Sequence, residues 1–347
     1  MRAVVLNGAR DVSVEEVPDA VVPGPDGLLL KVERTAICGS DLHLYHGPMT
    51  IPGVHLGHEF VGTVEDVGAG VRTVAKGDRV LVSGVIGCGH CPECRAGDIV
   101  VCRNAGTKVF GTSTDLHGGQ AEAVAVPAAD GAVVRIPEGI TDEQAVLLTD
   151  ILPTGYLGAQ RADITPGDVV AVFGLGPVGV FALQCAQLYG PSRIFAVDVV
   201  PDRLARAAEL GAEPIDATDG NAVAKIMEAT GGRGAEAVIE AVGADATIND
   251  AIMSAAPGGT VSVIGVSMNF GLPMPMPVLL FKRLTFRVTL ASIPTTWGAL
   301  FPLVASGKLH PEDVFTHRLG LSDAAEGYRI FDAREDGVLK VLLDPSA

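Results

Sequence analysis

The chain has 347 residues, of which 48% are hydrophobic and 19% charged, and its formal net charge at pH 7 is −16. This composition is typical of a packed globular protein, and the length favours two domains over one. The excess of acidic residues argues against a nucleic acid or an anionic membrane as partner, and without a membrane-length apolar run or a signal-peptide pattern we expect a cytoplasmic protein.

The first third of the chain predicts short antiparallel strands. Apolar and polar residues alternate through residues 1–36, and the turn residues at 23–27 separate the runs. Similar short runs follow at 61–68, 78–82 and 121–126, with glycines between them. This half is therefore expected to form a β-rich, partly open barrel.

Potential zinc ligands lie within this half of the chain. The motif Cys38-Gly-Ser40-Asp-Leu-His43 is followed by Gly57-His58-Glu59. Thiolate, imidazole and carboxylate are all ligand types suited to zinc. Because a serine and a histidine lie close to the cysteine, a proton could pass from a metal-bound group toward water. The stretch therefore predicts a catalytic metal site.

A second metal signature is a C-x2-C-x2-C-x7-C loop, formed by Cys88, Cys91, Cys94 and Cys102. Four thiolates at this spacing can complete a tetrahedron around zinc, with no position left for substrate. Disulfides are a poorer explanation in a large chain without a signal peptide. Scattered core cysteines would not explain the regular three-residue intervals. We therefore expect a structural zinc, a solvated His90 and a Cys185 that belongs to the core.

A helix is expected to begin at Thr141, because Thr141 and Gln144 have the spacing of a capping box. The helix leads to Asp150, a carboxylate among apolar residues. From its residue type and setting alone, Asp150 is most simply a helix cap or turn residue.

From residue 165 the pattern changes to alternating strands and helices. The strand 169–173 precedes a G-x-G-x-x-G motif, a helix to about residue 189 and a strand 193–197. The motif residues expected to bind a cofactor are Gly174, Gly176, Pro177, Val178 and Gly179. The motif alone is a weak signal, but between a strand and a helix, with an acidic residue 19 positions later, it is typical of dinucleotide binding.

That acidic residue, Asp198, is expected to determine which dinucleotide binds. Its carboxylate would accept hydrogen bonds from the ribose hydroxyls and repel a 2′-phosphate, so NAD is favoured over NADP. Arg203, a nearby cation, would weaken that repulsion.

The alternation continues to the end of the chain. Further helices are expected at 203–210 and 245–256, and strands at 235–239, 260–264 and 284–290. These form a doubly wound parallel sheet. Helices at 296–306 and 322–331 and an apolar strand at 338–343 follow, and the strand is expected to return to the first domain.

The order of these motifs resembles the zinc-containing alcohol dehydrogenases of the medium-chain dehydrogenase/reductase superfamily, over essentially the whole chain. The resemblance depends on both zinc motifs, on Asp150 before Thr154-Gly155, and on the glycine motif. It implies an α/β protein with a GroES-like catalytic domain (1–152 and 291–347), a Rossmann domain (153–290) and an active site in the cleft between them.

The resemblance also assigns roles to residues. It implies catalytic zinc ligands at Cys38, His58 and Asp150, with Glu59 either behind these ligands or as an alternating ligand. Together with the structural zinc this makes two zinc ions per chain. Zinc would act as a Lewis acid on the alcohol oxygen while the substrate carbon gives a hydride to NAD. The remaining implied roles belong to Ser40 and His43, which carry the proton away through the cofactor ribose, to Thr154 near the nicotinamide, and to Lys340 near Glu59 and the cofactor phosphates. Gln120 replaces an aromatic residue that is usual in the family.

Several alternatives remain open. A polyol, sugar or threonine dehydrogenase of the same superfamily is one, although the apolar segment 48–52 and the apolar Leu116 and Trp297 favour a simple or aryl alcohol. Complete zinc sites disfavour a zinc-free quinone reductase and a redox-inactive homologue. The acidic charge and the single cysteine loop disfavour a zinc-binding nucleic-acid module. We also expect a homo-oligomer, dimer or tetramer, with contact through the edge strand 284–290.

Overall fold

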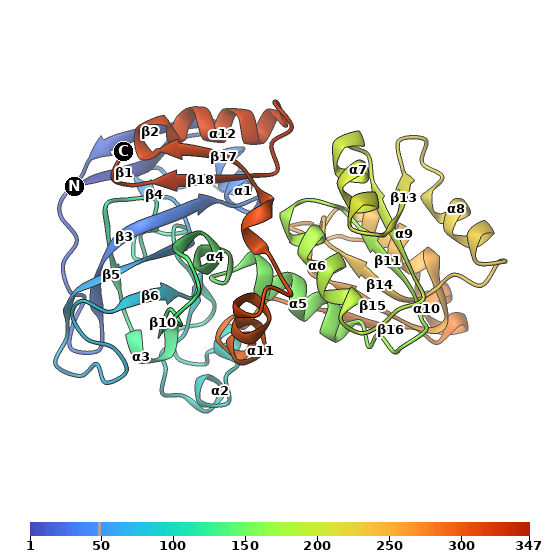
Figure 1. Cartoon of the computed structure of the whole chain (residues 1–347), viewed down its shortest axis with the longest axis horizontal. Coiled ribbons are helices and arrows are strands. Elements are labelled where there is room, and N and C mark those ends of the chain that lie inside the picture. The colour runs from blue at the N-terminus through green and yellow to red at the C-terminus, as the bar shows by residue number, and fades with distance from the viewer. Residues whose placement is uncertain (48–49) are drawn as a thin grey trace. The chain divides into compact units, whose positions relative to one another are not determined.

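The computed structural model describes residues 1–47 and 50–347, and Figure 1 shows its elements along the chain. The chain divides into two compact units, one formed by residues 1–153 and 292–347 and the other by 154–291. Pro48 and Met49, which belong to the apolar segment used above to infer substrate type, lie outside the described residues.

The first unit is built around a mixed sheet in which β3 is the central strand. β3 pairs with β5, β9 and β18, all antiparallel, and β18 pairs in parallel with β17. The strands are β3 (Leu28–Ile37), β5 (Glu59–Val67), β6 (Arg79–Val82), β9 (Ala123–Val126), β10 (Val133–Arg135), β17 (Phe315–Gly320) and β18 (Lys340–Asp344). β18 thus pairs with a strand of the first unit.

Smaller elements complete this unit. The remaining strands are β1 (Arg2–Gly8), β2 (Asp11–Glu16), β4 (Val54–His55), β7 (Val85–Ile86) and β8 (Lys108–Val109). The helices and 3-10 turns are α1 (Asp41–Tyr45), α2 (Pro92–Arg95), η1 (Ile99–Val101), α3 (Ala129–Ala132), α4 (Asp142–Leu147), α11 (Pro294–Ala305), η2 (Pro311–Val314), η3 (Leu321–Asp323) and α12 (Ala324–Ala333). Thr141 and Gln144 form the expected capping box at the start of α4.

Two larger apolar cores stabilise the first unit, alongside a smaller one that surrounds the cysteine loop. One contains Phe60 and Phe110, whose rings meet edge to face at 5.0 Å between centroids. The other lies where α12 packs beside β2 and β18, as Figure 1 shows, and it contains Tyr45 and Tyr328. The second core matters for function because its polar edge reaches the metal cluster described below.

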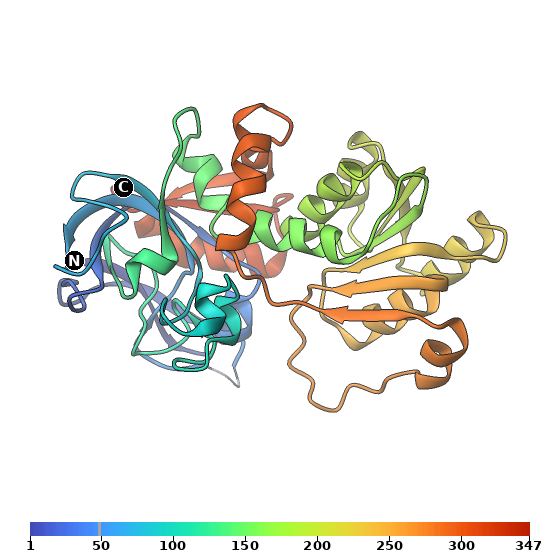
Figure 2. The ribbon, with the colours of Figure 1, turned by 90° about the horizontal axis from the view of Figure 1, so that it is seen from below.

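The second unit is a parallel sheet in the order β13-β12-β11-β14-β15-β16, and Figure 2 shows β14, β15 and β16 side by side. Its strands are β11 (Val169–Phe173), β12 (Arg193–Asp198), β13 (Glu213–Asp216), β14 (Ala235–Glu240), β15 (Ala255–Val263) and β16 (Thr285–Val288). The helices are α6 (Pro177–Gln187), α7 (Pro201–Glu209), α8 (Ala222–Ala229), α9 (Asp245–Ser254) and α10 (Met276–Lys282), and α5 (Ile151–Arg161) begins just before the unit. The predicted doubly wound Rossmann sheet is confirmed.

Some element boundaries differ from expectation. The helix expected over 245–256 ends at Ser254, and the following strand starts at Ala255 rather than at 260. Pairing of Ala255 with Ala235 explains this, because a sheet contact overrides the helix preference of two alanines. The strand expected over 284–290 is limited to 285–288. The elements β13, α8 and α10 were not predicted.

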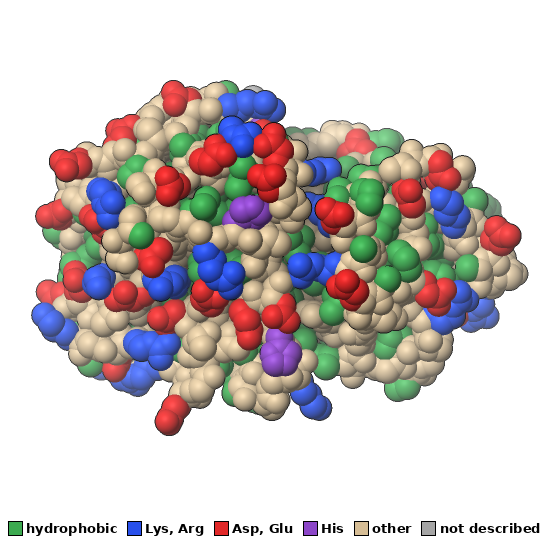
Figure 3. Space-filling view, turned by 45° about the horizontal axis from the view of Figure 1, so that its top comes forward, with side chains coloured by type: hydrophobic (Ala, Val, Ile, Leu, Met, Phe, Trp, Pro, Cys, Tyr) green, Lys and Arg blue, Asp and Glu red, His purple; other side chains and the backbone are tan. Residues whose placement is uncertain are grey.

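Charged side chains of both signs share the surface shown in Figure 3. On the face drawn in Figure 3, Lys and Arg side chains lie among Asp and Glu side chains rather than in a single basic patch. Among the residues that the structure describes, no helix is both long enough and apolar enough to cross a bilayer.

Candidate metal centres and dinucleotide-binding loop

The first candidate metal centre brings together four residues that are far apart in the sequence. Cys38 follows β3, His58 and Glu59 lie where β5 begins, and Asp150 lies in the turn between α4 and α5. One ligand atom from each residue lies within 4.8 Å of the others. The predicted ligands Cys38, His58 and Asp150 therefore meet in space, together with Glu59.

The spacing of these atoms fits a tetrahedral metal. His58 Nε2 lies 3.3 Å from Asp150 Oδ2, and Cys38 Sγ lies 3.7 Å from the same oxygen. Ligand atoms bonded to zinc at about 2.0–2.3 Å in a tetrahedron lie roughly 3.3–3.8 Å apart. Glu59 Oε2 is buried and has no hydrogen-bond partner among the described residues. The donor set therefore suits zinc.

Asp41 lies behind His58 and contributes negative charge. Its Oδ1 is 3.1 Å from His58 Nδ1, although the contact is not aligned as a hydrogen bond. Burial opposes a charged imidazole, but Asp41, Cys38 and Asp150 together raise the pKa of His58 well above its ordinary value. The same negative groups favour a bound cation, because a metal takes the place of the proton on the ring nitrogen.

The Cys38 thiol and the Glu59 carboxyl are shielded from water. Burial, and then the charge of Glu59, raise the pKa of Cys38. Burial also raises the pKa of Glu59, even though Lys340 Nζ lies 2.6 Å from its Oε1. Lys340 and Glu59 are both completely buried. Lys340 is thus found beside Glu59 as expected, while its contact with cofactor phosphates stays a prediction.

Ser40 lies directly against the cluster. Its hydroxyl is 3.3 Å from Cys38 Sγ and 3.2 Å from His58 Nε2. His43, three residues further along in α1, is exposed, and burial of part of its ring, followed by the charge of His46, lowers its pKa. A hydroxyl at the cluster and a solvent-facing imidazole on the same helical turn are suited to moving a proton outward.

The four cysteines of the loop form the second candidate metal centre, with all sulfur atoms within 4.8 Å of one another. Backbone N–H groups of Cys88 and Ala105 donate to Cys102 Sγ at 3.3 and 3.4 Å. Against the effect of burial, such donors lower the pKa of Cys102 to about 6. Donors that stabilise a thiolate are typical of a metal-bound cysteine. His90 is exposed and bonded to the Cys88 carbonyl, as expected for a residue outside the ligand set.

The glycine motif forms the turn between β11 and α6. Gly174 has φ +85°, and a Cβ at Gly179 would lie 1.8 Å from the Gly174 carbonyl oxygen, so neither position accepts a side chain. Gly176 is the N-cap of α6 and Pro177 its first residue. The free N–H groups at this helix start are suited to a pyrophosphate.

Asp198 ends β12 and faces this turn. Its carboxylate accepts hydrogen bonds from the backbone N–H groups of Leu175 at 2.6 Å, Val199 at 2.7 Å and Val200 at 3.0 Å. Asp198 is 8% exposed, and Arg203 Nη1 lies 3.7 Å from its Oδ2. The expected proximity of Asp198 and Arg203 to the glycine turn is therefore present in the structure.

The other singled-out residues have clear positions. Leu116 lies in the barrel core, and Trp297 donates its indole N–H to the Leu148 carbonyl, two residues before Asp150. His55 is buried and stacks on His117 at 3.8 Å between ring centroids. The role of Thr154 stays a prediction. Cys185 is completely buried, as expected for a core residue.

Sequence reasoning missed three residues that support the first metal centre, namely Asp41, Gln120 and Tyr328. Gln120 was noted only as a departure from the family pattern, and Tyr328 lies in a helix far along the chain. Asp41 gave a signal, since a carboxylate three residues after a ligand cysteine can turn back toward it, and the Cys38 N–H donates to Asp41 Oδ2 at 3.0 Å.

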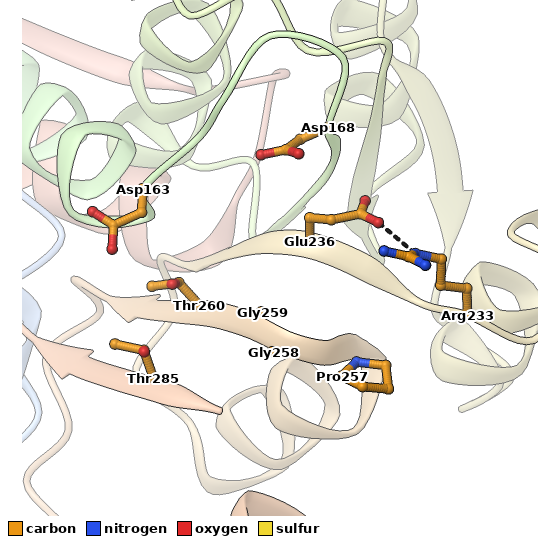
Figure 4. Close-up of a pocket in the computed structure, with 9 residues that line it drawn as sticks. All are labelled: Asp163, Asp168, Arg233, Glu236, Pro257, Gly258, Gly259, Thr260 and Thr285. Atoms are coloured by element: carbon orange, nitrogen blue, oxygen red, sulfur yellow. Dashed lines mark hydrogen bonds and ion pairs between the residues drawn. The ribbon is translucent and has the colours of Figure 1, made fainter. Parts of the chain in front are cut away.

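A cavity of about 420 Å³ in the second unit lies away from the dinucleotide loop, at the start of β11, β14 and β15 (Figure 4). Its acidic side chains already have partners. Glu236 pairs with Arg233 at 2.6 Å, Asp163 with Arg287 at 2.6 Å, and Asp168 accepts from the Thr165 N–H at 2.8 Å. These contacts account for the charges, so we assign no function to this cavity.

Comparison with known families agrees with this geometry. Residues 24–138 match the alcohol dehydrogenase GroES-like domain, and residues 177–306 match the zinc-binding dehydrogenase domain. The probable zinc-binding alcohol dehydrogenase Rv1895 of Mycobacterium tuberculosis is 50% identical over 349 residues, which cover 100% of this chain and 89% of the relative.

The chain belongs to the zinc-binding alcohol dehydrogenases of the medium-chain superfamily. Among solved structures, this zinc-binding dehydrogenase is similar to the alcohol dehydrogenase TADH from Thermus sp. ATN1, with 42% identity, a TM-score of 0.93 and coverage of 99% of both chains. A putative zinc-binding dehydrogenase from Sinorhizobium meliloti 1021, solved with NADP, has 31% identity, a TM-score of 0.85 and 99% coverage of both chains. The family establishes an oxidoreductase.

Proposed function

We propose that this dehydrogenase is a zinc-dependent, NAD-linked enzyme that interconverts an alcohol and its aldehyde or ketone by hydride transfer. The observation that supports this most strongly is the meeting of Cys38 Sγ, His58 Nε2 and Asp150 Oδ2 in one buried cluster. Three protein ligands of mixed type are typical of catalytic zinc, whereas the all-cysteine loop is typical of structural zinc.

The residues of the cluster have separate proposed roles in metal binding and proton transfer. When bound, zinc would supply Lewis acidity toward the alcohol oxygen, and NAD would supply the hydride acceptor. Cys38, His58 and Asp150 hold the metal, and Glu59 has one buried oxygen available as an alternating ligand. The Ser40 hydroxyl, 3.2 Å from His58 Nε2, would accept the alcohol proton and release its own toward the cofactor ribose, from which His43 would pass a proton to solvent.

NAD is the proposed cofactor because Asp198 is rigidly held at the glycine turn. Three backbone N–H donors stabilise its negative charge, and a 2′-phosphate beside that carboxylate would be repelled. Arg203 lies close enough to weaken the repulsion, and the Sinorhizobium meliloti structure holds NADP, so the cofactor must be tested directly. In the same proposal Thr154 contacts the nicotinamide and Lys340 the cofactor phosphates.

The substrate is proposed to be a simple or aryl-substituted alcohol, because Trp297, which donates a hydrogen bond to the Leu148 carbonyl near Asp150, is apolar. Leu116 packs in the barrel core and does not bear on this choice. The four cysteines of the loop are proposed to hold a second, structural zinc. We also propose that the chain forms a homo-oligomer.

The test combines zinc content with cofactor reduction. We expect about two zinc ions per wild-type chain, one at each centre, and faster reduction of NAD than of NADP with a hydrophobic alcohol. Cys38→Ala should retain only the structural zinc and lose turnover. Cys185→Ala is the matched control, since it removes a buried thiol outside both clusters and should keep both metals.

The outcomes distinguish a wrongly assigned metal site, a different substrate class and a different cofactor. One zinc per wild-type chain with no turnover of any alcohol would show that the first cluster is wrongly assigned. Turnover of threonine or polyols in place of simple alcohols would identify the alternative dehydrogenases of the superfamily. Faster reduction of NADP would refute the role given to Asp198.

A further inference from the structure

A buried polar network lies behind the first metal centre, on the side away from the ligand atoms. Asp41 begins α1, Gln120 precedes β9, and Tyr328 lies in α12. Their exposed fractions are 2%, 0% and 0%. Burying three polar side chains in one place is costly unless each is hydrogen-bonded. Such a network therefore needs an explanation beyond the packing of the core.

The bonds of the network converge on one carboxylate. Asp41 Oδ2 lies 3.0 Å from the Cys38 N–H, 3.4 Å from Gln120 Nε2 and 3.3 Å from the Tyr328 hydroxyl. Its other oxygen, Oδ1, faces His58 Nδ1 at 3.1 Å. The N–H donors of Cys38 and Gln120 on Oδ2 fix the carboxylate, so Oδ1 is held toward the imidazole.

The donors also have a defined direction. Tyr328 has one hydroxyl proton, and its shortest contact is to Gln120 Oε1 at 2.9 Å. With its oxygen occupied in this way, Gln120 directs its amide N–H groups to the Ala36 carbonyl at 3.1 Å and to Asp41. The orientation of Gln120 is therefore set from both ends, and Tyr328 controls it.

The backbone at position 57 makes room for this network. Gly57 has φ +97°, and a Cβ there would lie 2.4 Å from Gln120 Cγ. The residue before His58 thus packs its bare backbone on the Gln120 side chain. A change in Gln120 would reach His58 through this contact as well as through Asp41.

We propose that Gln120 and Tyr328 are positioning residues for the metal centre, which hold Asp41 in the orientation that keeps His58 aimed at the metal. The proposal rests on the zinc site proposed above. Groups that hold a histidine ligand through its second nitrogen set the orientation of the ring, and their loss typically costs about 10- to 100-fold in metal affinity. Since Tyr328 and Gln120 act one step further out, we expect about a 3- to 10-fold effect from each.

Zinc release to a coloured chelator provides the readout. The release phase that is absent in Cys38→Ala belongs to the first centre, and its rate is compared among variants. Tyr328→Phe and Gln120→Met, which keep side-chain volume but remove the donors, should each accelerate that phase about 3- to 10-fold.

Tyr45→Phe is the matched control. Tyr45 stacks on Tyr328 with 5.5 Å between ring centroids, and this substitution, like Tyr328→Phe, removes one hydroxyl group. It should release zinc at the wild-type rate. Thermal melting of each variant shows whether the fold is retained.

A double variant separates positioning from general packing. If Tyr328 acts through Asp41, Tyr328→Phe should add less than about a factor of two in the Asp41→Asn background. The Gln120→Met/Tyr328→Phe pair gives the same comparison if Asp41→Asn holds no zinc. Wild-type release rates in both single variants, or fully multiplicative effects in the doubles, would overturn the inference. A wild-type protein without the Cys38-dependent phase would instead refute the proposed zinc site.

Discussion

The buried ion pair between Lys340 and Glu59 allows a quantitative test. Both side chains are completely buried, and Lys340 Nζ lies 2.6 Å from Glu59 Oε1. Lys340→Met keeps the length of the side chain but removes its charge, which leaves a buried carboxylate without its partner. Breaking a buried pair from one side costs about 3–5 kcal/mol.

Glu59 can limit this cost by taking up a proton. Holding a carboxyl of ordinary pKa about 4.3 neutral at pH 7 costs roughly 3.7 kcal/mol, at 1.36 kcal/mol per pH unit. The folded variant then binds a proton that its unfolded chain releases, so its stability falls as the pH rises above the unfolded pKa. At pH 5 the same step costs only about 1 kcal/mol. The destabilisation should therefore be largest at neutral pH.

Urea unfolding at the two pH values measures this effect. Trp297 is the only tryptophan in the chain and belongs to the same unit as the pair, so its fluorescence reports on that unit. Glu59→Gln in the Lys340→Met background removes the need for a proton and should restore most of the stability at pH 7. If the free energy of unfolding of Lys340→Met at pH 7 lies within about 1 kcal/mol of the wild-type value, the reasoning is contradicted, because breaking a buried pair costs several times more. An equal loss of unfolding free energy at pH 5 and pH 7 would also contradict it.

Three further predictions concern the cofactor, the structural zinc and the subunit contact. Asp198→Ser should shift the kcat/KM ratio toward NADP by at least about tenfold, since one unfavourable charge contact of roughly 1.4 kcal/mol is removed; an unchanged ratio would show that Asp198 does not select the cofactor. Cys102→Ser should reduce zinc content by one per chain and lower the melting temperature, whereas loss of both metals would contradict separate sites. Phe281 and Val288 are 84% and 66% exposed on α10 and β16. Lysine at both positions should therefore convert an oligomer to a 35.7 kDa monomer in size-exclusion chromatography, and a wild-type protein that already runs as a monomer would refute the oligomer.

Local patterns account for most of what the sequence predicted. The glycine motif is contiguous and lies between β11 and α6, so spacing alone placed it on the correct turn. The cysteine loop is equally local. Asp150 was different, because its residue type and setting indicated only a turn, and the family resemblance brought it into the ligand set.

Gln120 and Tyr328 could not be predicted because nothing local distinguishes them. Tyr328 and Asp41 are 287 residues apart, and their contact depends on how α12 packs into the second core of the first unit. α10 was not predicted, and its exposed Leu280 and Phe281 depart from the burial that an apolar run indicates in a chain considered alone. Tertiary structure decides which polar side chains become buried, and local patterns in a single sequence do not show this.

The position of β18 beside β3 has a consequence for synthesis of the protein. The second unit is one continuous stretch, residues 154–291, and it can fold as soon as that stretch leaves the ribosome. The first unit is completed later. β5 and β9 can pair with β3 early, but the pairing of β18 with β3 at residues 35–37 forms only after residues 340–344 have emerged. Lys340 and Tyr328 are made after the second unit, so Cys38 and His58, the proposed zinc ligands, lack these buried partners until then. Metal capture at Cys38 and His58 should therefore follow the synthesis of β18.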